Sequence, residues 1–362
     1  MNILFISNLT GNLWAGPNNS VPAQVLAQAR IDNVMWLNLN HNCLPNWKRN
    51  EYIFANYDQY PNCKLIDLPA PFDKPDFIVC EEIYCYRPFN KMIVSVIDSG
   101  IPYSIIPRSS LTLMGQKNHA LKKKIANIIF YNRYIKRSKA IQYLTKYEES
   151  ESKKMFSQPS FVIPNGTNLP VIESKDFCRD GIKATYIGRV EIYQKGLDLL
   201  VEVINSMKEK LRDKGFSIDL YGPNRDNTVE ILSEKINEYG IGDLLRFKDA
   251  VFAEQKAEIL RNTDVFIMTS RFEGLPMGLI EALGYGVPCL ATEGTFLMDE
   301  IEKYNAGWAA GTDEESIKGA FNRMLDELDS FSLKSKNAVE LASHYSWDFL
   351  ASQLHEKIES LI

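Results

Sequence analysis

Residues 264–292 read DVFIMTSRFEGLPMGLIEALGYGVPCLAT, and this stretch decides the class of fold. The apolar run at 265–268 has the length of a buried strand, and a second such run follows at 288–291. The segment 277–285 between them has helical spacing, and Pro276 in front of it suits a first helical turn. Strand, helix and strand in this order predict a parallel α/β unit.

The same alternation continues through the whole chain. In the second half we expect further strands at 183–187, 217–221 and 246–248 and helices at 196–214, 228–239 and 254–262. In the first half we expect strands at 3–7, 34–39, 77–80 and 103–106 and a helix at 21–29. The sequence therefore predicts an α/β protein with two doubly wound, Rossmann-like domains. Ligands of such sheets bind outside the carboxyl ends of the strands, here in a cleft between the domains.

Length and composition agree with two globular domains. The chain has 362 residues, of which 45% are hydrophobic and 24% charged, the balance of a soluble protein. Pro164 and Gly166 interrupt the pattern, which predicts an N-terminal domain over 1–165 and a C-terminal domain over 166–345. The last segment, 346–362, is expected to be a helix.

Cellular location is predicted from what the sequence lacks. It has no run of 18 apolar residues, and its N-terminal MNILFIS has no basic leader. None of the six cysteines stands in a CxxC pair, so a zinc site and a disulfide framework are not expected. The cysteines are at positions 43, 63, 80, 85, 178 and 289. These features favour a cytoplasmic protein with reduced thiols.

Charge is distributed unevenly along the chain. Residues 1–165 hold 19 Lys and Arg against 12 Asp and Glu, whereas 166–362 hold 22 against 34. The cationic excess lies between Lys117 and Lys139, where isoleucines alternate with lysines at helical spacing. Two interpretations stay open: a solvated face over a core stripe, or a helix lying on an anionic membrane surface. Nucleic acid is not an expected partner, because the second half is acidic and no nucleic-acid-binding module is present.

The loop at 270–278 has the composition of an anion site. Gly274 and Pro276 allow the backbone to run close to a ligand, and the amides of Met277 and Gly278 are expected to be free at the helix start. Glu281 lies one turn after Met277, so its carboxylate can accept hydrogen bonds from vicinal hydroxyls. Glu273 is expected to face the same space. The alternative is that both glutamates are ordinary surface residues flanking a strand-to-helix turn.

A second group of candidate residues occurs at 188–196, GRVEIYQKG, again where a strand ends and a helix begins. Arg189 can bind a phosphate as a fork and Lys195 as a point charge. Together they can neutralise the charge that develops on a departing diphosphate. Cations are electrostatically unfavourable at a helix start, which favours a functional role over an accidental basic pair.

These segments resemble family 4 of the glycosyltransferases (glycosyl transferases group 1), which are retaining nucleotide-sugar enzymes of the GT-B fold. The resemblance covers nearly the whole chain. It is strongest in GRVEIYQKG and SRFEGLPMGLIEALGYGVPCLAT, and it is weaker in PRSSL at 107–111. It implies an N-terminal acceptor domain and a C-terminal donor domain, with the last helix crossing back to the N-terminal domain.

The resemblance also implies roles for individual residues. Arg189 and Lys195 would hold the donor diphosphate, Glu281 the ribose hydroxyls and Glu273 the hydroxyls of the transferred sugar. Arg189, Lys195 and Glu273 are thus the expected catalytic residues. The remaining donor contacts would come from Gly16, Gly222, Val251, Gly274, Leu275, Pro276, Met277 and Gly278, of which Gly222 and Val251 flank the base.

The first half departs from the family pattern. Its loop GPNNS holds one glycine, at position 16, where the family often has several. The family also has a histidine near the end of a first-domain strand, whereas this chain has Arg108 and Ser109 there. We expect Arg108, Ser109 and the more distant His119 to contact the acceptor.

The implied reaction is transfer of a hexosyl unit, with retention, to a hydroxyl of a glycan or lipid-linked glycan in bacterial surface polysaccharide synthesis. UDP-sugars are favoured over GDP-sugars as donors. No cofactor or metal is expected, because the sequence contains no Asp-x-Asp triplet and the two cations can replace an ion. A nucleotide-sugar epimerase of the same fold and a non-catalytic nucleotide-sugar-binding subunit remain alternatives.

Overall fold

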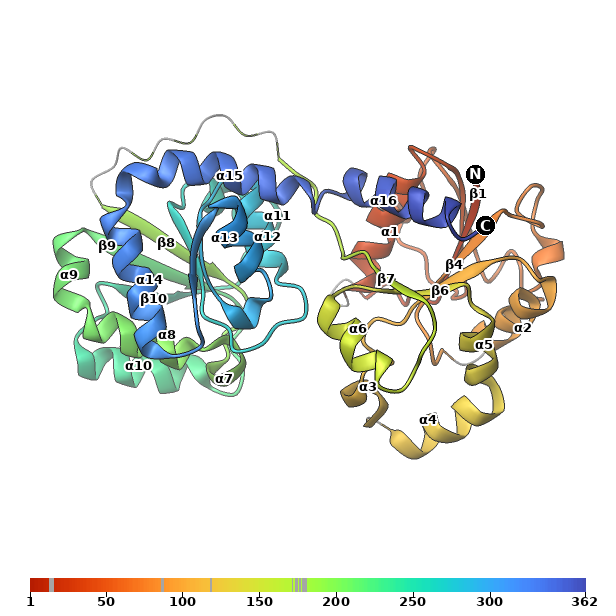
Figure 1. Ribbon diagram of the computed structural model, residues 1–362, viewed down its shortest axis with the longest axis horizontal. Helices are drawn as coiled ribbons and strands as arrows, with labels where there is room; N and C mark the ends of the chain where they lie inside the picture. The colour runs from red at the N-terminus through yellow and green to blue at the C-terminus, as the bar shows by residue number, and fades with distance from the viewer. Residues whose placement is uncertain are drawn as a thin grey trace. The chain divides into compact units, whose positions relative to one another are not determined.

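The computed structural model describes residues 1–12, 16–85, 88–117, 119–170, 172, 175, 177 and 181–362. The chain divides into two compact units (Figure 1). Unit 1 comprises Met1–Gly166 together with Trp347–Ile362, and unit 2 comprises Thr167–Ser346. Each unit is built on one parallel sheet covered by helices on both faces.

The sheet of unit 1 has seven strands in the order β3-β2-β1-β4-β5-β6-β7. All its strand pairs are parallel, and the direction of winding reverses between β1 and β4. The strands are β1 (Asn2–Ser7), β2 (Asn33–Asn38), β3 (Ile53–Asn56), β4 (Phe77–Glu81), β5 (Tyr103–Ile106), β6 (Ala140–Tyr143) and β7 (Ser160–Val162).

Alternation along the buried strands gives unit 1 two cores. In β1, Ile3 and Phe5 pack on one face of the sheet, and Leu4 and Ile6 pack on the other. This is why residues 3–6 of the strand are all apolar instead of alternating with polar residues. The helices that supply the two cores and their connections are α1 (Pro17–Gln28), η1 (Pro45–Trp47), η2 (Leu65–Asp67), α2 (Phe89–Ser99), α3 (Leu113–Lys117), α4 (Ala120–Ala126), the π-helix η3 (Asn127–Tyr131), α5 (Asn132–Arg137), α6 (Lys146–Lys153) and α16 (Trp347–Glu359).

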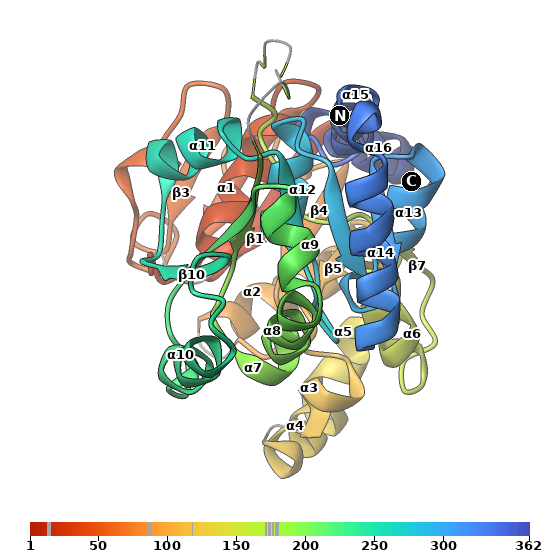
Figure 2. The same ribbon diagram turned by 90° about the vertical axis from the view of Figure 1, so that its left-hand side faces the viewer.

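The sheet of unit 2 has six parallel strands in the order β10-β9-β8-β11-β12-β13. The strands are β8 (Ile182–Ile187), β9 (Phe216–Tyr221), β10 (Leu245–Lys248), β11 (Val265–Met268), β12 (Cys289–Thr292) and β13 (Gly307–Ala310). The helices are α7 (Ile192–Lys195), α8 (Leu197–Ser206), α9 (Lys208–Asp213), α10 (Thr228–Tyr239), α11 (Ala253–Arg261), α12 (Met277–Gly284), η4 (Glu293–Thr295), α13 (Met298–Tyr304), α14 (Glu314–Asp326), η5 (Leu328–Ser330) and α15 (Phe331–Ser343). Figure 2 shows α8, α9, α10 and α14 around this sheet.

The predicted doubly wound α/β class is confirmed. The strands expected at 103–106 and 265–268 and the helix expected at 228–239 have the predicted bounds. The long helix expected at 196–214 is instead two helices, α8 and α9, because Met207 leaves helical geometry at φ −113° and ψ 6°. None of the described helices is both long and apolar enough to cross a bilayer.

The C-terminal helix α16 packs against α1 of unit 1 (Figure 1). Its Leu354 and Ile358 are buried in the same core as Val25 of α1.

His355 hydrogen-bonds the buried carboxylate of Asp32, which also accepts from the N-terminal ammonium at 2.7 Å. Burial raises the pKa of Asp32, but these hydrogen bonds outweigh it and the pKa is lowered. The pairing therefore stabilises unit 1 at pH values above the ordinary pKa of an aspartate. This stabilisation is lost as pH falls through the lowered pKa of Asp32.

The packing of α16 predicts how a truncation in it acts. Leu354→Ala should destabilise unit 1 by about 2–5 kcal/mol, because it removes a buried side chain and leaves a cavity. Amide hydrogen exchange should show faster exchange in β1 and β4 and no change in β8 and β11. The exposed neighbour Gln353→Ala is the control and should leave both sheets unchanged. Equal acceleration in the two sheets would contradict the assignment of α16 to unit 1.

Candidate functional site

The loops after β8 and β11 form the centre of the candidate site. The winding of the sheet in unit 2 reverses between these neighbouring strands. Loops at such a reversal leave the carboxyl edge side by side and open a ligand crevice. The first loop leads through α7 to Lys195, and the second contains Glu273 and leads to α12.

Lys195 and Glu273 form a buried ion pair between these two loops. Their side chains are 9% and 8% exposed, and the Lys195 Nζ contacts the Glu273 carboxylate directly. The buried Ser270 donates a second hydrogen bond of 2.6 Å to the same carboxylate. The structure thus joins the two residue groups that the sequence analysis treated separately.

Further contacts join the same two loops. Thr269 donates to the Lys195 and Gly196 carbonyls at 3.2 and 3.0 Å. Gly196 has φ +60°, and a Cβ there would lie 2.0 Å from the Thr269 carbonyl oxygen. Only glycine fits this turn, because it avoids both the strained φ and the clash.

Arg271 joins the loop after β11 to α8. Its guanidinium binds Asp198 through two hydrogen bonds of 2.7 and 2.8 Å and lies over the Tyr193 ring at 4.9 Å. Its backbone amide donates to the Gln194 carbonyl at 2.9 Å. Neither Arg271 nor Asp198 is predicted from the sequence, because the spacing between them carries no periodic signal.

The start of α12 differs from the expectation in one respect. Pro276 has φ −80° and ψ 78°, the geometry of an inverse γ-turn, and the Met277 amide donates to the Leu275 carbonyl at 2.9 Å. The Met277 amide is therefore not free, as the sequence analysis expected. Among the described residues, the Gly278 amide has no acceptor. A Cβ on Gly278 would lie 2.6 Å from the Ile187 carbonyl oxygen, so this glycine also lets α12 approach β8 closely.

Glu281 pairs with a residue that the sequence analysis missed. Its carboxylate contacts the Lys256 Nζ, and both side chains are partly buried, at 29% and 23% exposure. Lys256 lies on α11, shortly after Val251 in the loop that follows β10. The pattern of one helix does not show which residue of a neighbouring helix it faces, so this pair could not be predicted from the sequence.

Arg189 has a looser environment than Lys195. Its side chain is 47% exposed and donates to Gln194 at 3.0 Å, with Glu191 at 3.7 Å. The structure therefore provides one buried and one exposed cation in the GRVEIYQKG segment.

Gly222, directly after β9, has a packing role, since a Cβ there would lie 1.7 Å from the Gly188 carbonyl oxygen.

Tyr186 on β8 supports the Arg189 backbone. Its hydroxyl donates to the Arg189 carbonyl at 2.7 Å. Burial raises the pKa of Tyr186 well above its ordinary value, and the nearby Glu273 carboxylate adds to the shift. The phenol therefore stays protonated and keeps its hydrogen bond.

The carboxyl edge of the unit 1 sheet carries a second buried ion pair. Arg108, after β5, donates to Glu81 at the end of β4 at 2.8 and 3.1 Å and to Ser20 of α1 at 3.2 Å. Burial raises the pKa of Glu81, while Arg108 opposes the shift. The Ser109 amide donates to Glu148, and both Arg108 and Ser109 have positive φ. Such strain in non-glycine residues often accompanies a functional site.

Two other residues predicted in unit 1 lie in exposed positions. Gly16 caps the start of α1, and a Cβ there would meet nothing within 4 Å. Packing does not require glycine at this position. His119 is exposed, with φ 54°, and stands before α4.

The cysteines are expected to be reduced thiols. The structure shows free thiols at positions 43, 63, 80, 85 and 289, and Cys178 lies outside the described residues.

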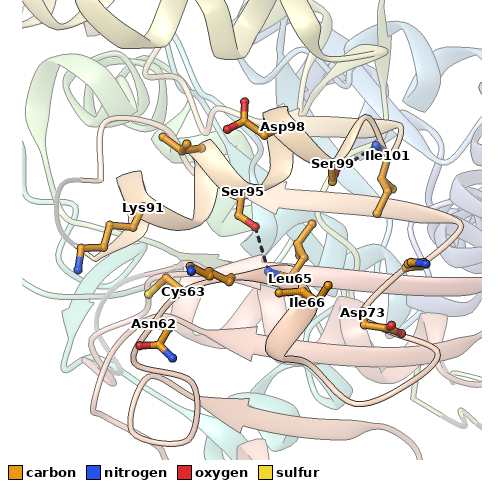
Figure 3. Close-up of a pocket in the computed structure, with 13 residues that line it drawn as sticks. Asn62, Cys63, Leu65, Ile66, Asp73, Lys91, Ser95, Asp98, Ser99 and Ile101 are labelled. Atoms are coloured by element: carbon orange, nitrogen blue, oxygen red, sulfur yellow. Dashed lines mark hydrogen bonds between the residues drawn. The ribbon is translucent and has the colours of Figure 1, made fainter.

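A large open cavity of about 980 Å³ lies elsewhere in unit 1, between α2 and the segment around η2 (Figure 3). Ser95 of α2 accepts a hydrogen bond of 3.0 Å from the Leu65 amide across it. Lys91 and Asp98 are among its charged residues, and Ile66 is one of the apolar ones. None of its lining residues belongs to the predicted site.

Comparison with known proteins matches the second half of the chain to one family. Residues 172–338 match the family model described as "Glycosyl transferases group 1". The uncharacterized glycosyltransferase MJ1178 of Methanocaldococcus jannaschii is 22% identical over 255 residues, which cover 69% of this chain and 68% of that protein. The amylovoran biosynthesis glycosyltransferase AmsD of Erwinia amylovora is 27% identical over 48% of this chain and 46% of its own length. The match to AmsD thus spans less than half of that protein.

Solved structures resemble the whole chain. HepE from Anabaena, in complex with UDP, has a TM-score of 0.69 at 14% identity and covers 99% of this chain and 100% of its own. A likeness at this identity establishes the fold. The two Rossmann-like domains therefore form the GT-B fold, as the sequence predicts.

The ion pair at the centre of the site predicts a stability cycle. Lys195→Met should destabilise unit 2 by about 3–5 kcal/mol, because Glu273 is then left buried without its counter-charge. Lys195→Met combined with Glu273→Leu should recover much of the loss, and urea denaturation would measure both. Exposed Lys214→Met is the control. Equal stability of the wild type and the single variant would show that the pair does not organise the loops.

Proposed function

We propose that this protein is a retaining glycosyltransferase that moves a hexosyl unit from a nucleotide diphosphate sugar to a hydroxyl of a glycan or lipid-linked glycan. The observation that carries the proposal is the buried Lys195–Glu273 pair at the winding reversal of unit 2. The pair lies within the residues that match the group 1 glycosyltransferase family. The amylovoran relative supports a role in surface polysaccharide synthesis, and the UDP complex of HepE supports a UDP-sugar donor.

The donor is proposed to bind along the carboxyl edge of the unit 2 sheet. Glu281 accepts hydrogen bonds from the ribose hydroxyls, and Lys256 holds its carboxylate in place. The Gly278 amide and Arg189 contact the diphosphate. The base lies by the backbone at Gly222 and Val251. Gly16 of unit 1 is a further proposed contact of the donor phosphates.

Lys195 and Glu273 are proposed to interact with different parts of the donor. Glu273 accepts hydrogen bonds from sugar hydroxyls with its carboxylate, whose Oε1 is held by both Lys195 and Ser270. Lys195 adds positive charge close to the diphosphate. Because the fold buries the two groups against each other, little reorganisation is needed when negative charge develops during the reaction.

The proposed step keeps the configuration of the sugar. The bond from the anomeric carbon to the leaving phosphate oxygen breaks, and the acceptor oxygen bonds to that carbon on the same face. The acceptor proton passes to the departing phosphate oxygen. Arg189 and Lys195 neutralise the nucleotide diphosphate, so the proposed reaction proceeds without a metal ion. Arg108 and Ser109 of unit 1 are the proposed acceptor contacts, with His119 further out.

A peripheral site of action on the inner face of the plasma membrane is part of the proposal. Lys122 and Lys124 of α4 are exposed and suited to an anionic lipid surface. Lys123 is different, because its Nζ donates to the Gly115 carbonyl at 2.6 Å and lies 5.0 Å from the centre of the Tyr84 ring. Burial lowers its pKa. Lys123 is therefore a structural residue of this segment.

Nucleotide binding tests the donor assignment. UDP should raise the melting temperature without magnesium more than GDP, ADP or CMP does, since a ligand of the native state stabilises it by RT ln(1 + [L]/Kd). Glu281→Ala should weaken UDP binding on the order of 10- to 100-fold, because it removes charge-assisted hydrogen bonds to the ribose.

Glu302→Ala, an exposed glutamate on α13, is the matched control and should bind UDP like the wild type. Unchanged UDP affinity in Glu281→Ala would refute the ribose contact. Binding of a UDP-sugar without transfer or hydrolysis would identify the non-catalytic alternative, and interconversion of two UDP-sugars would identify an epimerase.

Membrane contact is tested by co-sedimentation with vesicles of anionic phospholipid. Lys122→Ser combined with Lys124→Ser should reduce partitioning roughly 30-fold, because each lysine near an anionic surface contributes about 1 kcal/mol. Lys214→Ser combined with Lys336→Ser removes the same charge from exposed positions of unit 2 and is the control. Equal loss in both double variants would mean that net charge, and not α4, determines binding.

A further inference from the structure

Residues 113–137, here called the helical arm, comprise α3, α4, η3 and α5, with Asn118 outside the described residues. In Figures 1 and 2, α3 and α4 project away from the sheet of unit 1. The arm exposes large apolar side chains to an unusual degree. They are Met114 (70% exposed), Leu121 (73%), Ile125 (50%), Ile128 (71%) and Ile129 (76%). A cluster of this kind on one surface element marks a binding surface.

The inner side of the arm carries a polar network next to the buried Tyr131. Tyr84, in the loop after β4, donates to Asn127 at 2.7 Å and accepts from Gln116 at 2.8 Å. Asn127 donates to Gln116 at 3.2 Å, which closes the network. Gln116 and Asn127 are both buried. α3 and η3 thus turn hydrogen-bonded polar groups inward, while the isoleucines of α4 and η3 lie outside instead of facing the core.

An open cavity of about 540 Å³ lies on this outer surface. Ile125, Ala126, Ile129 and Phe130 supply an apolar wall, and Lys122 and Asn90 supply polar groups. Among the described residues, the Asn90 Oδ1 has no hydrogen-bond partner. The cavity thus combines a hydrocarbon-like wall with one cation, and the Asn90 Oδ1 beside it is buried.

Charge in the surrounding sequence narrows the class of ligand. Residues 99–147 contain ten Lys and Arg and no Asp or Glu. An apolar ligand without charge would gain nothing from these cations, whereas an anionic amphiphile would be attracted to them. The apolar wall and the cations together fit a hydrocarbon chain that carries a phosphate group.

We propose that this cavity binds the hydrocarbon chain of a phosphate-bearing amphiphile. This identification rests on the proposed function: the amphiphile is the lipid part of the acceptor, and the acceptor is therefore lipid-linked. Tyr131, at the end of η3, donates to the Cys85 carbonyl at 2.8 Å. This bond ties the cavity wall to the loop that follows β4, whose last residue, Glu81, binds Arg108. The cavity wall and the Glu81–Arg108 pair are thus joined through the segment that follows β4.

Decyl phosphate, used below its micelle concentration, is the probe, and isothermal titration calorimetry is the measurement. Ile129→Ser should weaken binding about tenfold or more, because Ile129 lines the cavity. Ile128→Ser is the matched control, since Ile128 is equally exposed but does not line the cavity. Its affinity should stay within about twofold of the wild type. Lys122→Gln should weaken the binding of decyl phosphate more than the binding of decyl maltoside, because decyl maltoside has the same chain but no charge.

Three results would overturn the proposal. Equal weakening by Ile128→Ser and Ile129→Ser would indicate a flat membrane-facing surface and not a chain site. Inorganic phosphate that binds as tightly as decyl phosphate would show that the chain is not recognised. A dimer of the wild type in sedimentation velocity that both serine variants abolish would show that a second copy covers the isoleucines.

The UDP-induced melting shift separates this proposal from the proposed function. Both serine variants should retain it, because the predicted donor side chains lie in unit 2. A UDP shift without decyl phosphate binding refutes the chain site alone. Decyl phosphate binding without any UDP shift counts against the glycosyltransferase assignment and leaves the chain site intact.

Discussion

The ion pair between Lys195 and Glu273 is the interaction on which the candidate site depends. Two charges with less than a tenth of their side chains exposed have lost most of their hydration, so each requires the other. The pair therefore holds the loops after β8 and β11 in one arrangement. The turn at Gly196 and the start of α12 are built on these loops. A ligand that meets Glu273 meets a carboxylate whose position is already set.

The two sheets follow the same plan but carry different chemistry at their carboxyl edges. Winding reverses between β8 and β11 in unit 2 and between β1 and β4 in unit 1. In unit 1 the corresponding edge carries the Glu81–Arg108 pair, with Arg108 at φ 48°. Backbone strain of this kind persists only where neighbouring contacts over-determine it. Arg108 is held by Glu81 and Ser20, so the carboxyl edge of unit 1 carries an ion pair whose position is set by neighbouring contacts.

Sequence patterns predicted the fold better than the site. Buried strands such as 265–268 are apolar throughout, so they stand out, whereas short strands such as β3, IFAN, and β7, SFV, are too brief to do so. Glycine and proline placed the loop before α12 correctly, but they did not show that the γ-turn at Pro276 uses the Met277 amide. The partner of Glu281, Lys256, lies on another helix. Such pairs depend on how helices pack, and no spacing along one segment encodes that.

The helical arm shows how a pattern with two interpretations is resolved by its neighbours. Isoleucines that alternate with lysines fit a helix with its apolar side on a core, and also one with that side outward. In unit 1 the choice follows from Gln116 and Asn127 of the arm, whose side chains hydrogen-bond to each other and to Tyr84. Turning the isoleucines inward would break these bonds and leave buried polar groups unpaired, at a cost of about 1–3 kcal/mol each. The apolar side therefore stays exposed because the polar side is satisfied, and hydrophobic burial of the isoleucines requires a partner outside unit 1.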